Sequence, residues 1–250
     1  MLILSMESSA KPASVAVCSN GELLGQNFQN SGLTHSRTLL SMADSLLKNL
    51  GISAADIELF AVSRGPGSFT GVRIGVSAVK GLAWGLNKPV CGVSTLEAMA
   101  YQTPVPDVLL CPVMDARRDQ VYNALFRWRN GTPGRLRDDR AISLADLAAD
   151  LRILTAAPPL SSSNPPDNSE FRIPNSEFPP SVLLIGDGAK ISYDYLSATG
   201  VPCRIAPDLM RWQTAFGVAI AALNARQIPA IELEPSYLRP SQAERERMSK

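Results

Sequence analysis

The residues best suited to chemistry lie in the segment from Gly65 to Gly71, whose sequence is Gly-Pro-Gly-Ser-Phe-Thr-Gly. Glycine allows positive φ angles and close approach of the backbone to a ligand, and the free N–H groups of a following helix can bind an anion. The segment is not a P-loop, because Val72 and Arg73 follow the last glycine, and it also lacks the Rossmann spacing. It is consistent with either a tight structural turn or a phosphate-binding loop.

The single histidine, His35, limits the sites that the chain could build by itself. A site with two or more histidines is impossible, and no Gly-x-Ser-x-Gly sequence marks a serine nucleophile. A surface or interface position at the start of a helix is the favoured interpretation of His35, with a catalytic base as the alternative. The cysteines lie far apart without a Cys-x-x-Cys pair, which is typical of buried reduced thiols in a cytoplasmic protein: Cys18, Cys91, Cys111 and Cys203.

Composition narrows the class of protein further. The chain has 250 residues, of which 45% are hydrophobic, and this is enough for one large core or two modest ones. Its 24 Lys and Arg residues nearly balance 23 Asp and Glu residues, so we expect no tight nonspecific binding to nucleic acid. It has no apolar run of about 18 residues that could span a membrane, and 1–6 reads as a first strand rather than a signal peptide.

Hydrophobic periodicity predicts two β-rich halves, each followed by helices. Strands are expected over 2–6, 14–18, 22–28, 57–63, 90–93, 108–114, 120–128 and 182–185. Helices are expected over 34–50, 72–86, 143–151, 189–196 and 212–226. This order indicates a two-lobed α/β protein.

The boundaries of the two lobes follow from composition. The first lobe is expected over 1–100, completed by a helix near 207–230, and the second over 101–206. Residues 158–181 are rich in proline, serine and asparagine, so we expect a disordered insertion there. Residues 231–250 are expected to form an extended polar tail.

Glycines are unusually frequent in the expected helix 72–86. Gly71 and Gly75 are four residues apart, as are Gly81 and Gly85. Each glycine inside a helix costs about 1 kcal/mol relative to alanine, so close approach of another helix is the expected compensation. Since apolar residues cover much of the remaining surface, one side of this helix is a candidate subunit interface.

Several segments together resemble the TsaB (YeaZ) family. The longest match runs from Ser63 to Gly75, followed by Lys80–Ala83 and Gly92–Glu97. Shorter matches occur in the same order at Glu7-Ser8-Ser9, His35-Ser36, Asp115-Ala116-Arg117, Gly186-Asp187-Gly188 and Tyr237-Leu238-Arg239. The resemblance covers the chain apart from 158–181 and the extreme tail. It implies an actin/Hsp70-like (ASKHA) two-lobed fold with ribonuclease-H-like sheets.

The resemblance also bears on catalysis. The catalytic relative, TsaD, carries a His-x-x-x-His metal pair, and those positions correspond here to Thr95 and Met99. Threonine is a poor metal ligand and methionine a soft one, so no metal site and no catalytic residue are expected. The resemblance therefore implies a non-catalytic scaffold that activates TsaD for threonylcarbamoyl transfer to the adenosine beside the anticodon of tRNA.

A nucleotide site is a weaker expectation. The family usually has aspartate at the end of the first strand, where this chain has Glu7. The longer side chain would displace a carboxylate that must be held closely. Weak binding of ATP or ADP, without hydrolysis and without any required cofactor, is therefore the expectation. The candidate residues are Glu7, Ser8, Gly65, Gly67, Ser68, Gly186 and Gly188.

Partners are also implied by the resemblance. The helices 34–50 and 72–86 are expected to pack against the equivalent pair of TsaD, or against a second copy of this chain when TsaD is absent. The expected contact residues are His35, Leu39, Ala43, Leu47, Val72, Gly75 and Val79. The ATPase TsaE would dock on the assembled pair. Replacement of Gly75 by leucine is expected to weaken TsaD binding and to leave the isolated fold largely intact.

Two other functions fit some of the same features. One is an independent peptidase-like or nucleotide-handling enzyme, against which Thr95, Met99 and the single histidine argue. The other is a tRNA-binding module. The near-neutral net charge argues against this function, and only a local cluster of arginines supports it. A solvated basic face is the favoured interpretation of that cluster, so tRNA contact is expected only within the complex: Arg127, Arg129, Arg135, Arg137 and Arg140.

Overall fold

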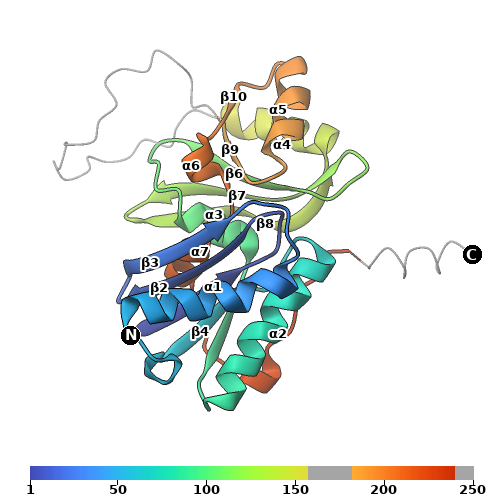
Figure 1. Cartoon of the computed structure of the whole chain (residues 1–250). Coiled ribbons are helices and arrows are strands. Elements are labelled where there is room, and N and C mark those ends of the chain that lie inside the picture. Colours follow the sequence, from blue (N-terminus) through green and yellow to red (C-terminus); the bar gives the residue numbers. More distant parts are fainter. Residues whose placement is uncertain (157–181, 240–250) are drawn as a thin grey trace, which may run out of the picture.

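The computed structural model describes residues 1–156 and 182–239, which form two lobes that each contain a five-stranded mixed sheet (Figure 1). The expected insertion 158–181 and the end of the tail lie outside the described residues. The first sheet has the order β3-β2-β1-β4-β5. Its strands are β1 (Leu2–Glu7), β2 (Ala13–Ser19), β3 (Glu22–Gln29), β4 (Leu59–Ser63) and β5 (Val90–Val93).

The second sheet repeats the first. Its order is β8-β7-β6-β9-β10, and in both sheets an antiparallel three-stranded meander is extended by two parallel strands. This repeated arrangement is the one expected for two ribonuclease-H-like lobes. The strands are β6 (Leu109–Asp115), β7 (Gln120–Arg129), β8 (Thr132–Ser143), β9 (Val182–Ile185) and β10 (Cys203–Ile205).

Helices cover both faces of the first sheet. The helices α1 (His35–Leu50) and α2 (Phe69–Gly85) pack on one face, where they bury an apolar core with β1, β2 and β4. The helix α7 (Ala215–Ala222) packs on the other face, although it comes from the far end of the chain. The side chain of Ser5 in β1 joins it there by donating a hydrogen bond to the Ala215 carbonyl at 2.7 Å.

The helix α3 (Thr95–Tyr101) connects the lobes. Ala98 packs in the core between α7 and the first sheet, whereas Leu96 and Met99 pack on the second sheet. The other face of the second sheet is covered by α4 (Leu144–Ala156) and α5 (Ala189–Ala198). The single-turn helix α6 (Asp208–Arg211) precedes α7, and the 3-10 turns η1 (Ala54–Asp56) and η2 (Ala230–Glu232) complete the described elements.

Two of the glycines in α2 allow a close approach, but to the chain after β1 rather than to another helix. A Cβ atom at Gly71 would collide with the carbonyl oxygen of Ser8, and one at Gly75 would collide with the Ser8 hydroxyl. The Ser8 hydroxyl donates to the Gly71 carbonyl at 2.9 Å. Gly81 and Gly85, by contrast, have open space around them. The expectation that a leucine at position 75 leaves the fold intact is therefore wrong.

Some elements differ from the sequence-based prediction. The helix expected over 212–226 is restricted to Ala215–Ala222, and α3, α6, β8 and β10 were not expected. In α7 nearly every residue is apolar, so periodicity could not define its ends. The edge strand β8 has an Arg- and Asp-rich sequence with Pro133 and Gly134, which lacks the usual composition of a strand.

The close packing at Ser8 gives a matched test with one substitution at two positions. Gly71→Ala should lower the free energy of unfolding by about 1–3 kcal/mol, because overpacking outweighs the gain in helix propensity. Gly81→Ala should raise it by about 1 kcal/mol, because the added methyl group meets nothing. Urea unfolding of both variants measures the difference, and equal changes of the same sign would contradict this packing.

Candidate functional site between the lobes

The main candidate site is a cavity of about 480 Å³ between the lobes. The first lobe contributes the turn after β1 and the glycine turn before α2, and the second lobe contributes the turn after β6. The first and last of these turns follow β1 and β6, which are equivalent strands of the two sheets, and the glycine turn follows β4. The cavity therefore lies at the carboxyl ends of these strands. Its lining residues include Ser9, Lys11, Gly67, Ser68, Phe69, Asp115, Arg117, Asp187 and residues 236–239.

Glu7 ends β1 behind this cavity and is almost completely buried. One carboxyl oxygen, Oε1, accepts a hydrogen bond from the Ser9 N–H at 2.6 Å, while Oε2 has no partner among the described residues. Burial raises the pKa of Glu7 above its ordinary value, and the nearby Asp187 carboxylate adds to that increase. This shift is toward the neutral form of the carboxyl group, which weakens it as a site for a cation.

Asp187 and Asp115 are the acidic residues on the second-lobe side of the cavity. Burial raises the pKa of Asp187 to about 6, although Gln213 donates a hydrogen bond to its carboxylate at 2.9 Å. Asp115 forms an ion pair with Arg117 at 3.4 Å. Across residues 1–156 and 182–239, no three histidine, cysteine, aspartate or glutamate side chains come together in a way that could hold a metal ion.

The glycine turn is shaped by contacts with the chain itself. A Cβ atom at Gly67 would collide with the Ser9 carbonyl, and the Ser68 N–H donates to that same carbonyl at 2.6 Å. The Ser68 hydroxyl accepts a hydrogen bond from the Gly71 N–H and so caps α2. These contacts account for the glycines as parts of a tight structural turn, one of the two interpretations that the sequence left open.

Only Gly67 and Ser68 of the expected nucleotide-binding residues line the cavity. Glu7 and Ser8 are buried behind it. The remaining glycines serve close packing: Gly65 against the Ser236 carbonyl, Gly186 against the Val113 carbonyl and Gly188 against the backbone of Met114. The structure thus brings two of the expected residues to the cavity and places the others in its supporting wall.

The expected interface residues lie largely inside the first lobe. Five of them are buried in its core: Leu39, Ala43, Val72, Gly75 and Val79. Leu47 is half-buried. The His35 ring is also half-buried, and its Nε2 lies 2.8 Å from the Ala10 carbonyl, to which it donates. The buried residues therefore belong to the core of the first lobe and not to its surface.

A different set of α2 residues faces solvent. Arg73, Ser77, Gly81 and Gly85 are exposed at intervals of four residues, which places them on one side of the helix. Trp84 beside them has 73% of its surface exposed, and Leu40 of α1 is also exposed. The four-residue spacing of small residues was visible in the sequence. It identifies this α2 face once the buried side of the helix is known.

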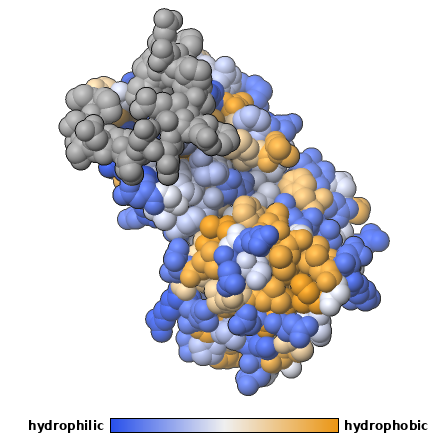
Figure 2. All heavy atoms as spheres, turned by 90° about the vertical axis from the view of Figure 1, so that its left-hand side faces the viewer, coloured by the Kyte–Doolittle hydropathy of each residue, from blue (hydrophilic) through white to orange (hydrophobic). Residues whose placement is uncertain are grey.

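The first lobe carries a second candidate contact surface. Figure 2 shows a broad apolar patch on the first lobe, on the side where β3 lies in Figure 1. β3 exposes three large apolar side chains, Leu23, Leu24 and Phe28. Apolar patches of this kind mark interaction surfaces, and sequence analysis did not single out this strand.

Thr95 and Met99 both lie in α3 and are fully buried. The Thr95 N–H donates a hydrogen bond to the Gly65 carbonyl at 2.9 Å, and this contact helps to hold the glycine turn in place. Met99 packs in the core formed with the second sheet. Neither side chain lines the interlobe cavity, so these two positions are structural in this chain.

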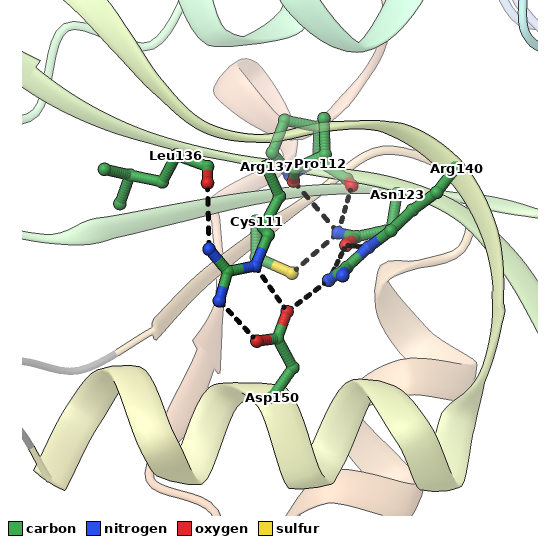
Figure 3. Close-up of polar contacts among 8 residues, drawn as sticks. Cys111, Pro112, Asn123, Leu136, Arg137, Arg140 and Asp150 are labelled. Atoms are coloured by element: carbon green, nitrogen blue, oxygen red, sulfur yellow. Dashed lines mark hydrogen bonds and ion pairs between the residues drawn. The ribbon is translucent and has the colours of Figure 1, made fainter.

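The arginine cluster is mostly engaged in ion pairs, as Figure 3 shows for part of it. Arg137 and Arg140 of β8 both pair with Asp150 of α4, at 3.0 and 2.6 Å. Despite burial, the hydrogen bonds from these two arginines hold the pKa of Asp150 below its ordinary value. Arg140 also donates to Asn123, whose Nδ2 donates to the Pro112 carbonyl.

The third member of that cluster, Arg135, pairs with Glu97 and Asp139. Arg127 and Arg129 form no ion pair with the described residues. The expectation of a solvated basic face is therefore wrong for Arg135, Arg137 and Arg140. These side chains attach the edge strand β8 to α3 and α4.

The repeated sheets and the cavity between them define a protein of the two-lobed actin-like class, as expected from the sequence. The family model for TsaD, described as tRNA N6-adenosine threonylcarbamoyltransferase, matches residues 29–245. The chain belongs to this family. Among the described residues, no helix is both long enough and apolar enough to cross a membrane.

Individual relatives agree with the expected TsaB (YeaZ) resemblance and confirm it. The chain is 35% identical over 146 residues to TsaB of Bacillus subtilis, with 58% of this chain and 64% of the relative covered. It is 37% identical over 131 residues to TsaB of Escherichia coli, covering 51% and 55%. The match therefore spans less than two thirds of the length of these curated relatives. The structure of YeaZ from Pseudomonas aeruginosa has a TM-score of 0.67 and 24% identity, covering 95% and 99%.

The raised pKa of Asp187 predicts a pH-dependent effect of Asp187→Asn. The wild-type carboxyl holds its proton in the folded state up to about pH 6 but loses it near 3.8 when unfolded, so its contribution to stability falls as pH rises through this window. The variant should therefore be more stable than wild type by up to about 3 kcal/mol at pH 7.5, and by much less at pH 4.

Guanidinium denaturation at both pH values measures this difference. The exposed Asp138 gives the matched control, since Asp138→Asn should change stability by less than about 0.5 kcal/mol at either pH. A variant at position 187 that is less stable than wild type at pH 7.5 would contradict the assigned direction.

Proposed function

We propose that this protein is a non-catalytic scaffold subunit. It binds a TsaD-type transferase and activates it for threonylcarbamoyl transfer to the adenosine beside the anticodon of tRNA. The single observation that carries the proposal is that Thr95 and Met99 are a threonine and a methionine buried in the core, at the two positions where the family resemblance places the metal-binding histidines of TsaD. The chain therefore has the family fold without the imidazoles that a metal at that place would need.

The α2 face is the proposed docking surface for the transferase. Small residues at Ser77, Gly81 and Gly85 permit close approach of a partner helix, and the exposed glycines of α2 have no compensating contact among the residues that the structure describes. Trp84 supplies a large exposed aromatic side chain, a residue type enriched among the dominant contacts of interfaces. The same face would pair with a second copy of the chain when the transferase is absent.

The remaining parts of the proposal concern ligands and other partners. ATP or ADP would bind weakly, at Gly67 and Ser68 in the interlobe cavity, and no cofactor is required. The ATPase TsaE would dock on the assembled pair, and this chain would contact tRNA only as part of the complex. Such a role belongs in the cytoplasm.

Reconstitution tests the scaffold role directly. Purified TsaD, TsaE, ATP, threonylcarbamoyl-adenylate synthase and tRNA are combined, and this chain or TsaD is omitted in turn. Modified adenosine should form only when both are present. Modification without this chain would remove the scaffold proposal and return attention to an independent enzyme.

The docking surface is tested by Trp84→Ala and Gly81→Leu. Trp84→Ala should weaken TsaD binding by about 30-fold, because truncating a dominant aromatic contact costs about 2 kcal/mol or more. Gly81→Leu should also weaken binding while the isolated chain remains folded, since position 81 is open.

Ile153→Ala provides the matched control. Ile153 has 69% of its surface exposed but lies on α4 of the second lobe, so its truncation should leave TsaD affinity unchanged. Calorimetric titration measures all three variants. Wild-type affinity in Trp84→Ala and Gly81→Leu would move the docking site away from α2, for example to the β3 side.

A further inference from the structure

Residues 234–239, here called the strap, cross the opening between the lobes. The chain leaves the first-lobe core at Leu233, which is fully buried. The Ser236 N–H then donates to the Arg64 carbonyl at 2.7 Å, and the Ser236 carbonyl occupies the space where a side chain at position 65 would lie. The glycine turn is therefore shaped to receive the strap.

The strap is attached to the first turn of α2 by an aromatic contact. The Tyr237 ring stacks on Phe69, with centroids 4.6 Å apart and an interplanar angle of 27°. The Tyr237 hydroxyl accepts a hydrogen bond from Arg73 Nε at 2.8 Å. The Arg73 guanidinium also lies 3.8 Å from the centre of the Phe69 ring, so the three side chains form one stack.

The other end of the strap reaches the second lobe. Arg239 Nη1 donates to the Ala116 carbonyl at 3.0 Å, in the turn after β6. Tyr237 and Arg239 are thus attached to opposite lobes although only one residue separates them in the chain. Any movement that opens the cleft must break one of these two attachments.

The strap also divides the space between the lobes. Ser236 to Arg239 line the cavity of about 480 Å³ that holds Gly67, Ser68 and Asp187. Ser236 lines a second cavity too, of about 280 Å³, which lies against Arg64, Glu97 and Asp139. Ser236 of the strap therefore lies between the two cavities, and residues 236–239 form part of the wall of the larger one.

We propose that the strap is an autoinhibitory latch, which ties the two lobes together and holds nucleotides out of the larger cavity. Release of Arg239 from Ala116 and of Tyr237 from Phe69 opens the cavity. The inference rests on the nucleotide binding included in the proposed function, and it assigns a role to the Tyr237-Leu238-Arg239 sequence. It also explains why nucleotide binding by the intact chain would be weak.

The first part of the test measures the latch without ligand. In the full-length chain, Tyr237→Ala combined with Arg239→Ala should increase amide hydrogen exchange at Ser236 by at least about 10-fold. Without the two attachments, the hydrogen bond from the Ser236 N–H to the Arg64 carbonyl should open more often. Glu234→Ala is the matched control and should not change the exchange, since Glu234 is exposed, lines neither cavity and belongs to neither attachment. Tyr237→Phe keeps the stack and should have only a small effect. Unchanged exchange in the double variant would overturn the latch.

The second part uses ADP as the probe, by calorimetric titration of the same proteins. The double variant should bind ADP at least about 10-fold more tightly than wild type, with Glu234→Ala close to wild type. Faster exchange without tighter ADP binding would overturn the autoinhibitory role. The scaffold proposal is judged separately, by TsaD binding of the Trp84 variant, because Trp84 lies outside the strap.

Discussion

The close approach of α2 to the chain after β1 is the constraint on which the rest of the structure depends. Ser8 lies directly against Gly71 and Gly75, and no side chain larger than glycine fits at either position. This contact fixes the start of α2, and with it the positions of Gly67 and Ser68 at the interlobe cavity. It also determines which side of α2 is buried, and therefore which of its residues are exposed to solvent.

The same packing limits the chemistry of the cavity. Glu7 ends β1 directly before Ser8, so its carboxyl group is buried, with one oxygen unpaired among the described residues. Asp187 on the opposite side is also driven toward its neutral form. With a pKa of about 6, Asp187 still ionises at neutral pH, whereas burial shifts Glu7 toward its neutral form. The two carboxyl groups therefore differ as ligands for a divalent cation, which binds ionised carboxylates.

The sequence was sufficient to predict the two lobes, since the strands of both meanders have regular apolar patterns and the segment 63–75 is highly specific. It did not predict the edge strand β8, which is held by ion pairs such as Arg140 with Asp150 rather than by an apolar face. The family resemblance implied an interface on the helices 34–50 and 72–86, and most of the residues chosen there belong to the apolar pattern of each helix. Because periodicity marks the apolar side of a helix, it identified Leu39, Val72 and Val79, which pack inside the lobe. The strap contacts join residues far apart in sequence, so no local pattern could reveal them.

The position of α7 has a consequence for how the protein is made. The second sheet pairs β6, β7 and β8 within one continuous stretch of chain, whereas the first sheet needs α7 from residues 215–222 to cover one of its faces. During synthesis from the N-terminus, Ile3, Leu59 and Ala61 must therefore stay without their covering helix until most of the chain has been translated. The first lobe begins first and is completed last. Until then, one apolar face of its sheet stays open to contacts with other chains.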